Sequence, residues 1–353
     1  MGRPAHLCNG QGVQSYAGKI GSCSSAHTAL TLPGYRGRTV LKRLLLASPR
    51  GYCAGVERAV ETVERALAHY GRPVYVRKQI VHNSHVVEEL QARGAVFVDT
   101  LADVPEGATV VFSAHGIAPA VRRAAEDLRL TTIDATCPLV TKVHAQARRY
   151  AEAGYAIVLI GHAGHEEVEG TLGEAPDAIV LVESTDDAER VSLPTGRPLA
   201  YVTQTTLSVD ETNEIVAVLR RRFPRIEGPA REDICYATSN RQWAVKELLR
   251  EVDLLLVVGS PNSSNSQRLV DVARAEGTPA YLVDDTHGID ESWLEGCETV
   301  GLTSGASAPE RLVAEVCAWF TERGAEVREQ ELVHEDVSFK LPVELRRAER
   351  AAA

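Results

Sequence analysis

The chain has 353 residues, of which 44% are hydrophobic and 24% are charged, a composition typical of a globular protein. No run of about 18 apolar residues occurs, so the sequence predicts no membrane-spanning helix. The formal net charge of -10 argues against general binding of nucleic acid, and a bound anion needs a local site.

Residues 1–40 contain basic but no acidic side chains and are rich in glycine and serine, without a sustained hydrophobic period. We expect a disordered extension here; the alternative is a plastid transit peptide, a class rich in serine and arginine and poor in acids. Cys8 and Cys23 lie in this segment and receive no role. Seven cysteines without a clear secretory segment indicate a reducing compartment, which we take to be the cytoplasm.

From residue 42 onward, strand-like and helical patterns alternate in three similar passes. Each pass has a cysteine before an amphipathic helix, and then three strands, each followed by a polar loop and a helical or Asp-containing segment. The first strands of the passes lie in "PVYVRKQIVHNSHVVEEL", "YAIVLIGHAGHEEVEGTL" and "VDLLLVVGSPNSSNSQRLV". This alternation predicts an α/β fold of three pseudo-threefold-related lobes with mostly parallel sheets flanked by helices.

The passes also set the expected boundaries of the lobes. We expect the first lobe at 41–136, the second at 137–234, the third at 235–322, and a C-terminal tail at 323–353. The strand at 42–48 has no repeat of its own and is predicted to complete the third sheet. Because ligands of parallel sheets collect at the C-terminal ends of strands, the polar loops should converge on one place.

Three cysteines recur at predicted junctions, each after a strand and before a helix. Cys53, Cys137 and Cys235 lie in "PRGYCAGVERAV", "DATCPLVTKVH" and "EDICYATSNRQ", where a helix N-terminus stabilises a thiolate. Their wide spacing fits neither a structural zinc site nor the tight motif of a radical-SAM enzyme. Three thiolates suit an iron–sulfur cluster with one iron that lacks a protein ligand. Cys297 and Cys317 are predicted to be structural.

The polar loops carry side chains that suit a phosphate or diphosphate group. These donors are His82, His115, His165, Thr205, Thr206, Ser263, Ser264, Asn265 and Ser307. Several precede helices, whose N-termini attract anions, although each alone could be an ordinary helix cap or a structural histidine. Glu167 in "GHAGHEEVEG" is a candidate proton donor; the alternative is a solvated acid at a helix start.

Nine segments together resemble a known family. "PRGYCAGVERA", "VHN", "SAHG", "DATCPLVTKVH", "GHAGHEEVEGT", "TQTTLSVD", "DICYATSNRQ", "GSPNSSNSQRL" and "SGASAP" resemble the 4-hydroxy-3-methylbut-2-enyl diphosphate reductase (IspH/LytB) family, over about residues 42–345. The resemblance implies a three-lobed fold around one central 4Fe-4S cluster, with one open iron site. It implies Cys53, Cys137 and Cys235 as the cluster ligands.

The resemblance also implies an activity. Members of this family are iron–sulfur oxidoreductases of isoprene biosynthesis, which remove the substrate's allylic hydroxyl by reduction to give isopentenyl and dimethylallyl diphosphates, the last step of the non-mevalonate pathway. The histidines, Thr205, Ser263, Ser264, Asn265 and Ser307 match the diphosphate ligands, Thr206 is adjacent and orients the substrate, and Glu167 matches the proton-relay acid. "VSFKLPVEL" resembles the family's tail, which packs across the lobes.

Partners and alternatives follow from the same resemblance. It implies ferredoxin or flavodoxin as the electron donor, and neither nucleic acid nor a membrane as a partner. A non-redox hydratase remains an alternative, because an open cluster iron also suits dehydration. A cluster-based iron or redox sensor is the alternative outside enzymes, and the phosphate-suited loops argue against it.

Overall fold

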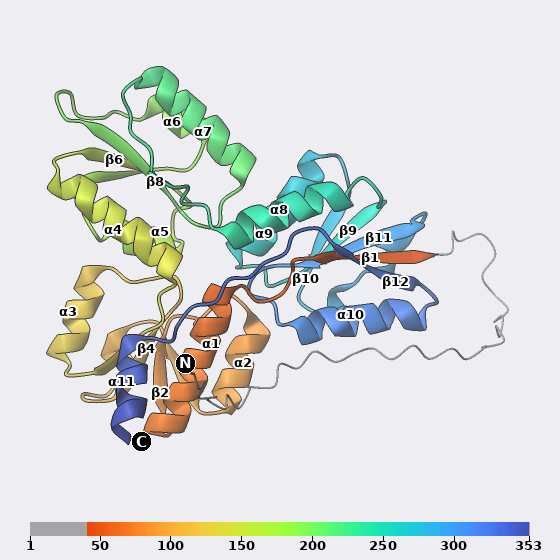
Figure 1. Ribbon diagram of the computed structural model, residues 1–353, viewed down its shortest axis with the longest axis horizontal. Coiled ribbons are helices and arrows are strands. Elements are labelled where there is room, and N and C mark those ends of the chain that lie inside the picture. The colour runs from red at the N-terminus through yellow and green to blue at the C-terminus, as the bar shows by residue number, and fades with distance from the viewer. Residues whose placement is uncertain (1–40, 353) are drawn as a thin grey trace, which may run out of the picture. The chain divides into compact units, whose positions relative to one another are not determined.

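The computed structural model describes residues 41–352, in which strands and helices alternate along the chain (Figure 1). The predicted α/β class with three parallel sheets is confirmed. The extension at 1–40, with Cys8 and Cys23, lies outside the described residues. Within the described part, no helix is both long enough and apolar enough to cross a membrane.

The four-stranded sheet has the order β3-β2-β4-β5, with every pair parallel. Its strands are β2 (Val74–Arg77), β3 (Ala95–Val98), β4 (Thr109–Phe112) and β5 (Thr131–Asp134). The helical segments of this part of the chain are α1 (Ala54–Tyr70), α2 (Ser84–Ala92), η1 (Leu101–Asp103) and α3 (Pro119–Asp127).

The three-stranded sheet has the order β7-β6-β8 and is also parallel. Its strands are β6 (Ala156–Ile160), β7 (Ile179–Val182) and β8 (Leu199–Thr203). The accompanying helices are α4 (Pro138–Glu152), α5 (Glu166–Leu172), α6 (Thr185–Arg190) and α7 (Val209–Arg222). Both faces of β6 are buried, which explains its continuous apolar sequence.

The five-stranded sheet has the order β10-β9-β11-β1-β12. Its strands are β1 (Arg43–Ser48), β9 (Leu254–Val258), β10 (Ala280–Val283), β11 (Thr299–Ser304) and β12 (Glu326–Glu331). The helical segments here are α8 (Tyr236–Leu248), α9 (Ser264–Ala275), η2 (Thr286–Gly288), η3 (Glu291–Leu294) and α10 (Glu310–Glu322). The last helix, α11 (Val343–Ala352), packs against α1.

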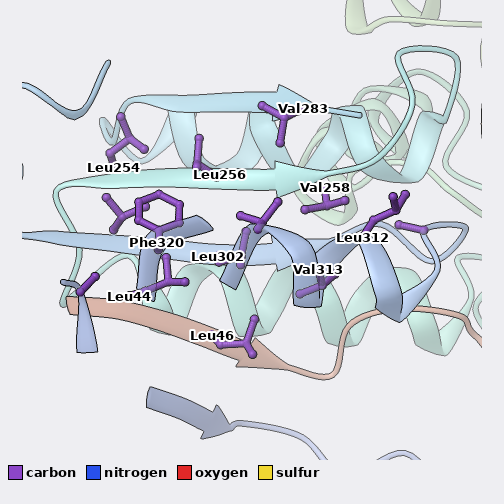
Figure 2. Packing of buried hydrophobic residues seen from close by; sticks show 14 of the residues in the cluster. Leu44, Leu46, Leu254, Leu256, Val258, Val283, Leu302, Leu312, Val313 and Phe320 are labelled. Atoms are coloured by element: carbon purple, nitrogen blue, oxygen red, sulfur yellow. The ribbon is translucent and has the colours of Figure 1, made fainter. Parts of the chain in front are cut away.

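Alternating residues of β1 supply two separate cores. Leu44 and Leu46 pack with Phe320 of α10 on one face of the five-stranded sheet (Figure 2). Leu45 packs with Leu248 of α8 on the other face. This period of two is what a strand buried on both faces requires.

The first and last strands of the described chain lie side by side, orange-red and blue in Figure 1. β1 pairs in parallel with β11 and with β12, so it is an interior strand, and β12 forms the edge. Residues 326–331, which the sequence placed in a C-terminal tail, therefore form a strand of this sheet.

A common strand order places the three cysteines at corresponding positions of the fold. In each sheet the second strand of the pass lies at one edge and pairs with the first strand, and the first strand pairs with the third. The other side of the third strand pairs with β5 in the four-stranded sheet, with the single residue Glu227 in the three-stranded sheet and with β1 in the five-stranded sheet. Each of these segments leads along the chain to a cysteine. The expected strand before Cys235 is therefore wrong: only one residue pair forms there.

Candidate active site

Loops that follow strands of all three sheets meet at one cavity of about 100 Å³. Every site residue that the sequence predicted lines it. They are Cys53, Cys137, Cys235, His82, His115, His165, Glu167, Thr205, Thr206, Ser263, Ser264, Asn265 and Ser307. The convergence follows from the parallel strands, whose C-terminal ends face the same place.

The three cysteines of this cavity are free thiols at matching positions of the fold. Cys53, Cys137 and Cys235 are the N-cap residues of α1, α4 and α8. A Cβ at Gly55 would lie 2.8 Å from Sγ of Cys137 and 3.7 Å from Sγ of Cys53. Two sulfurs therefore border one small space, and glycine in the first turn of α1 leaves that space open.

Burial opposes ionisation of these thiols. Burial raises the pKa of Cys137 to about 12, with the neighbouring Cys53 and Cys235 adding to the shift. Burial, followed by the charge of Cys53, raises the pKa of Cys235 to about 11. Three thiolates at this place therefore need a positively charged partner, and a bound metal group supplies that charge.

The spacing of the sulfurs fits a cluster better than a single ion. Within residues 41–352, His82, His115 and Glu166 are the three His, Cys, Asp or Glu residues whose ligand atoms lie within 4.8 Å of one another. The three cysteine sulfurs do not all lie within that distance of one another. Wider spacing suits an iron–sulfur cluster, in which each cysteine binds a different iron.

Three histidine rings form one wall of the cavity. His82 stacks on His115 with ring centroids 4.0 Å apart, and His165 meets the two edge-on at 5.3 and 5.8 Å. Burial, and then the charge of the neighbouring histidines, lowers the pKa of His82 to about 2 and that of His165 to about 3. These two rings are therefore neutral near pH 7 until an anion arrives.

Hydrogen bonds to the protein fix which ring nitrogens face the cavity. The Glu167 amide donates to Nδ1 of His165 (3.1 Å), so neutral His165 carries its proton on Nε2. Nδ1 of His115 lies 3.1 Å from a carboxylate oxygen of Glu166, which holds this ring nitrogen away from the cavity's ligand. Nε2 of His82 is buried without a hydrogen-bond partner. The Nδ1 atoms of His115 and His165 are thus held by the protein, and the Nε2 atoms of the three rings remain available to a ligand.

Hydroxyl groups from three loops are linked by hydrogen bonds. Thr206 Oγ1 lies 3.2 Å from Ser264 Oγ, and Ser263 Oγ lies 3.3 Å from Ser307 Oγ. Ser263 also caps α9, so these hydroxyls lie at a helix N-terminus. Asn265 accepts a hydrogen bond from the Ala306 amide (2.8 Å), which ties the loop after β11 to α9. Hydroxyls and a helix N-terminus together suit a phosphate.

Glu167 is a buried carboxyl group with two defined partners. It is 2% exposed. The amide of Thr205 donates to Oε1 at 2.7 Å, and the Thr205 hydroxyl donates to Oε2 at 3.0 Å. Burial raises the pKa of Glu167 to about 7, against the hydrogen bonds from Thr205, which lower it. The group therefore sits near the pKa that suits proton transfer at neutral pH.

The sequence analysis missed several residues that build this cavity. Gln204 Nε2 donates to Thr206 Oγ1 (2.8 Å), and its Oε1 accepts from the His162 amide (3.1 Å). The Thr238 amide donates to Sγ of Cys235 (3.4 Å), and Phe339 lines the cavity from the C-terminal segment. The motifs "TQTT" and "CYAT" contained the first two, and "VSFKLPVEL" contained Phe339 without indicating that this side chain reaches the cavity.

Comparisons with known proteins agree with this geometry. Residues 44–321 match the family described as LytB protein. The chain belongs to the LytB family. The family is iron–sulfur dependent, in keeping with the three cysteines at the cavity.

Relatives within the LytB family are similar over most of the chain. The 4-hydroxy-3-methylbut-2-enyl diphosphate reductases of Acidothermus cellulolyticus and Nocardia farcinica are 61% and 58% identical over 312 and 311 residues. These alignments cover 88% of this chain and 92% and 93% of the relatives.

Solved LytB structures show the same arrangement. The E-1-hydroxy-2-methyl-but-2-enyl-4-diphosphate reductase of Plasmodium falciparum matches with a TM-score of 0.87 at 41% identity, covering 88% of this chain and 99% of that one. A second structure, of the terminal enzyme of the non-mevalonate pathway, matches with a TM-score of 0.58 at 31% identity, covering 80% and 100%.

Proposed function

We propose that this LytB chain reduces 4-hydroxy-3-methylbut-2-enyl diphosphate to isopentenyl and dimethylallyl diphosphates, the terminal step of the non-mevalonate isoprenoid pathway. Two electrons and two protons enter; the C–O bond of the allylic hydroxyl breaks, a C–H bond forms at either of two carbons, and oxygen leaves as water. The observation that supports this function most directly is a single cavity, which combines three free cysteines, donors suited to phosphate and a buried carboxyl group.

The cofactor we propose is one 4Fe-4S cluster held by Cys53, Cys137 and Cys235. It is supported by the number and the spacing of the thiols and by the open space beside Gly55. It is also supported by the position of each cysteine at the N-terminus of a helix. When bound, such a cluster supplies electrons one at a time and a Lewis-acidic iron that has no protein ligand.

The diphosphate is held, in this proposal, by the donors on the opposite wall of the cavity. His82, His115 and His165 donate from their ring nitrogens, and an arriving anion favours the cationic forms of His82 and His165. Ser263, Ser264, Asn265 and Ser307 add neutral donors beside the N-terminus of α9, and Thr206 orients the substrate. Thr205 joins these donors if its hydroxyl turns from Glu167 to the diphosphate. Neutral donors suit a chain whose net charge is -10, because they bind the anion locally.

Glu167 is the proton donor that we propose. Its hydrogen bonds to Thr205 fix the carboxyl group at the cavity, and burial keeps a proton available near neutral pH. The His165 ring accepts a hydrogen bond from the Glu167 amide and meets the His115 ring edge-on. The protein thus holds the acid and the anion site on one short segment.

The electron source and the location complete the proposal. We expect ferredoxin or flavodoxin to deliver the electrons, because each step needs a one-electron carrier. We expect a cytoplasmic location, because all five cysteines within residues 41–352 are free thiols and a reducing compartment keeps them so.

Consumption of reduced methyl viologen under anaerobic conditions tests the reaction. With the reconstituted protein we expect oxidation of the dye only when 4-hydroxy-3-methylbut-2-enyl diphosphate is added, with both products formed. A hydratase would convert substrate without oxidising the dye. A sensor would do neither, and either of these results would contradict the proposed reduction.

A further inference from the structure

Each helix that begins after a cavity cysteine carries a basic residue in its second turn. These residues are Arg58 on α1, Lys142 on α4 and Arg241 on α8. The reaction proposed above uses none of them. Each one donates hydrogen bonds to the backbone of a loop that leads into a different cysteine.

Arg58 reaches the loop that ends at Cys137. Its Nη1 donates to the carbonyl oxygens of Ala135 (2.9 Å) and Thr136 (3.1 Å), and its Nη2 donates to that of Asp134 (3.4 Å). The side chain is largely buried, since the residue is 9% exposed. α1 is thereby fastened to the backbone immediately before the second cysteine.

Lys142 makes the same connection one step further around. Its Nζ donates to the carbonyl oxygens of Arg231 (2.7 Å) and Glu232 (2.6 Å) and lies 3.1 Å from a carboxylate oxygen of the buried Asp233. These residues come directly before Cys235. α4 is thereby fastened to the loop that carries the third cysteine, which compensates for the missing strand there.

Arg241 closes the cycle. It is fully buried, and its Nη2 donates to the carbonyl oxygens of Gly51 (2.9 Å) and Arg50 (3.4 Å), in the loop that ends at Cys53. Each of the three helices is thus tied to the loop of the next cysteine. The last of these ties returns to the first cysteine, so the connections form a closed ring.

Two members of the ring also fasten the C-terminal segment over the cavity. Arg58 Nε donates to the carbonyl oxygen of Lys340 (2.7 Å). Arg241 Nη1 lies 3.1 and 3.3 Å from the two carboxylate oxygens of Glu335. Phe339, which lines the cavity, lies between these two attachment points.

We infer that Arg58, Lys142 and Arg241 form a cation ring that fixes the three cysteines relative to one another and offsets part of the cluster's negative charge. The inference rests on the proposed function for the presence of the cluster. Asp233 and Glu335 balance part of the charge of Lys142 and Arg241, and the thiolates and a bound cluster would add further negative charge beside the ring. Groups that lie behind metal ligands in this way orient the ligands.

Lys142→Gln gives the sharpest test, because the Lys142 side chain is 31% exposed and glutamine keeps a hydrogen-bond donor for the same carbonyl oxygens. We expect the anaerobically reconstituted variant to release iron to a chelator about 10-fold faster than the wild type, the scale of an outer-shell substitution. We also expect a lower midpoint potential, since loss of a positive charge disfavours the added electron. Lys142→Arg keeps the charge and should keep the wild-type potential.

Arg274→Gln is the matched control. Arg274 also donates to a backbone carbonyl, that of Ala280 (3.1 and 2.8 Å), but it does not adjoin a cysteine loop. It should release iron at the wild-type rate. Wild-type iron release and potential in Lys142→Gln, or equal iron loss in Arg274→Gln, would overturn the ring. A wild-type protein that takes up no iron would overturn the proposed function and the ring with it.

Discussion

Glu167 combines burial, two hydrogen bonds from Thr205 and a position at the cavity wall. Glu167→Gln keeps the shape of this side chain but cannot deliver a proton. We expect iron content and substrate affinity to survive, because no cysteine or diphosphate donor changes, and turnover to fall roughly 10²- to 10⁴-fold. Wild-type turnover, measured with iron content and affinity on one preparation, would remove Glu167 from the mechanism.

The same carboxyl group predicts a pH dependence. Because burial raises the pKa of Glu167 to about 7, the group is mostly protonated below that pH and mostly ionised above it. An acid must be protonated to act, so kcat should fall as the pH rises through about 7. A pH profile of kcat in Glu167→Gln should lack this limb; the same limb in the variant would assign it to another group.

The cysteines divide into two classes by their surroundings. Cys137→Ser should strongly reduce iron content, because it removes one of three sulfurs at the cavity. Cys317→Ser is the control, because Cys317 lies on α10 against the apolar core of the five-stranded sheet. Anaerobic iron analysis compares them. Full iron content in Cys137→Ser would refute the proposed ligand set.

The candidate site residues recur in corresponding loops of three passes, and the structure brings all of them to one cavity. Because the three sheets share one strand order, the loops that recur in the sequence meet at one place in the fold. Phe339 could not be predicted in this way, because its place depends on buried Arg58 and Arg241 holding the C-terminal segment. A basic residue after each cysteine, as in "CAGVER", "CPLVTK" and "CYATSNR", was a signal that went unused.

At the scale of single elements, the first turn of α1 is shaped by the cavity. Gly55→Ala would bring a Cβ within 2.8 Å of Sγ of Cys137, closer than such contacts normally come. Alanine favours a helix over glycine by up to about 1 kcal/mol, so the apoprotein should not lose stability on account of its helix. We therefore expect lower iron content with a retained fold.

A substitution in the same turn provides the comparison. Glu57 is exposed on α1, so Glu57→Ala should keep the wild-type iron content. Iron content and circular dichroism of both variants distinguish a local effect on the sulfurs from a general effect on the helix. Wild-type iron content in Gly55→Ala would show that the space beside this glycine is not needed.

Elements with strong apolar patterns were predictable, whereas their pairing depended on distant segments. The run "RLLLAS" identifies a buried strand, but its place between β11 and β12 depends on residues far along the chain. β12 itself has the sequence "EVREQE", whose exposed, charged pattern is typical of an edge strand. Because this pattern lacks a run of apolar residues, the sequence analysis assigned it to the C-terminal tail. The lead-in to Cys235 failed as a strand because only Glu227 pairs with β8.

At the scale of the whole molecule, residues 1–40 and β1 should contribute very differently to folding. Removal of residues 1–40 should leave iron content and turnover intact, because β1 begins at Arg43 and the cavity lining lies within residues 53–339. Removal of residues 1–48 is the contrasting truncation, since it deletes an interior strand. It should abolish folding. Lost turnover in a soluble protein that lacks only 1–40 would contradict this account.

The central claim is that one cavity holds both a three-cysteine cluster and the substrate. Mössbauer spectroscopy of the protein reconstituted with ⁵⁷Fe, before and after addition of 4-hydroxy-3-methylbut-2-enyl diphosphate, tests it most directly. We predict that the signal of the one iron without a cysteine ligand changes when substrate binds, while the signals of the other irons stay nearly the same. Substrate binding that leaves every iron signal unchanged, or a cluster whose irons are all equivalent with four protein ligands, would contradict the account.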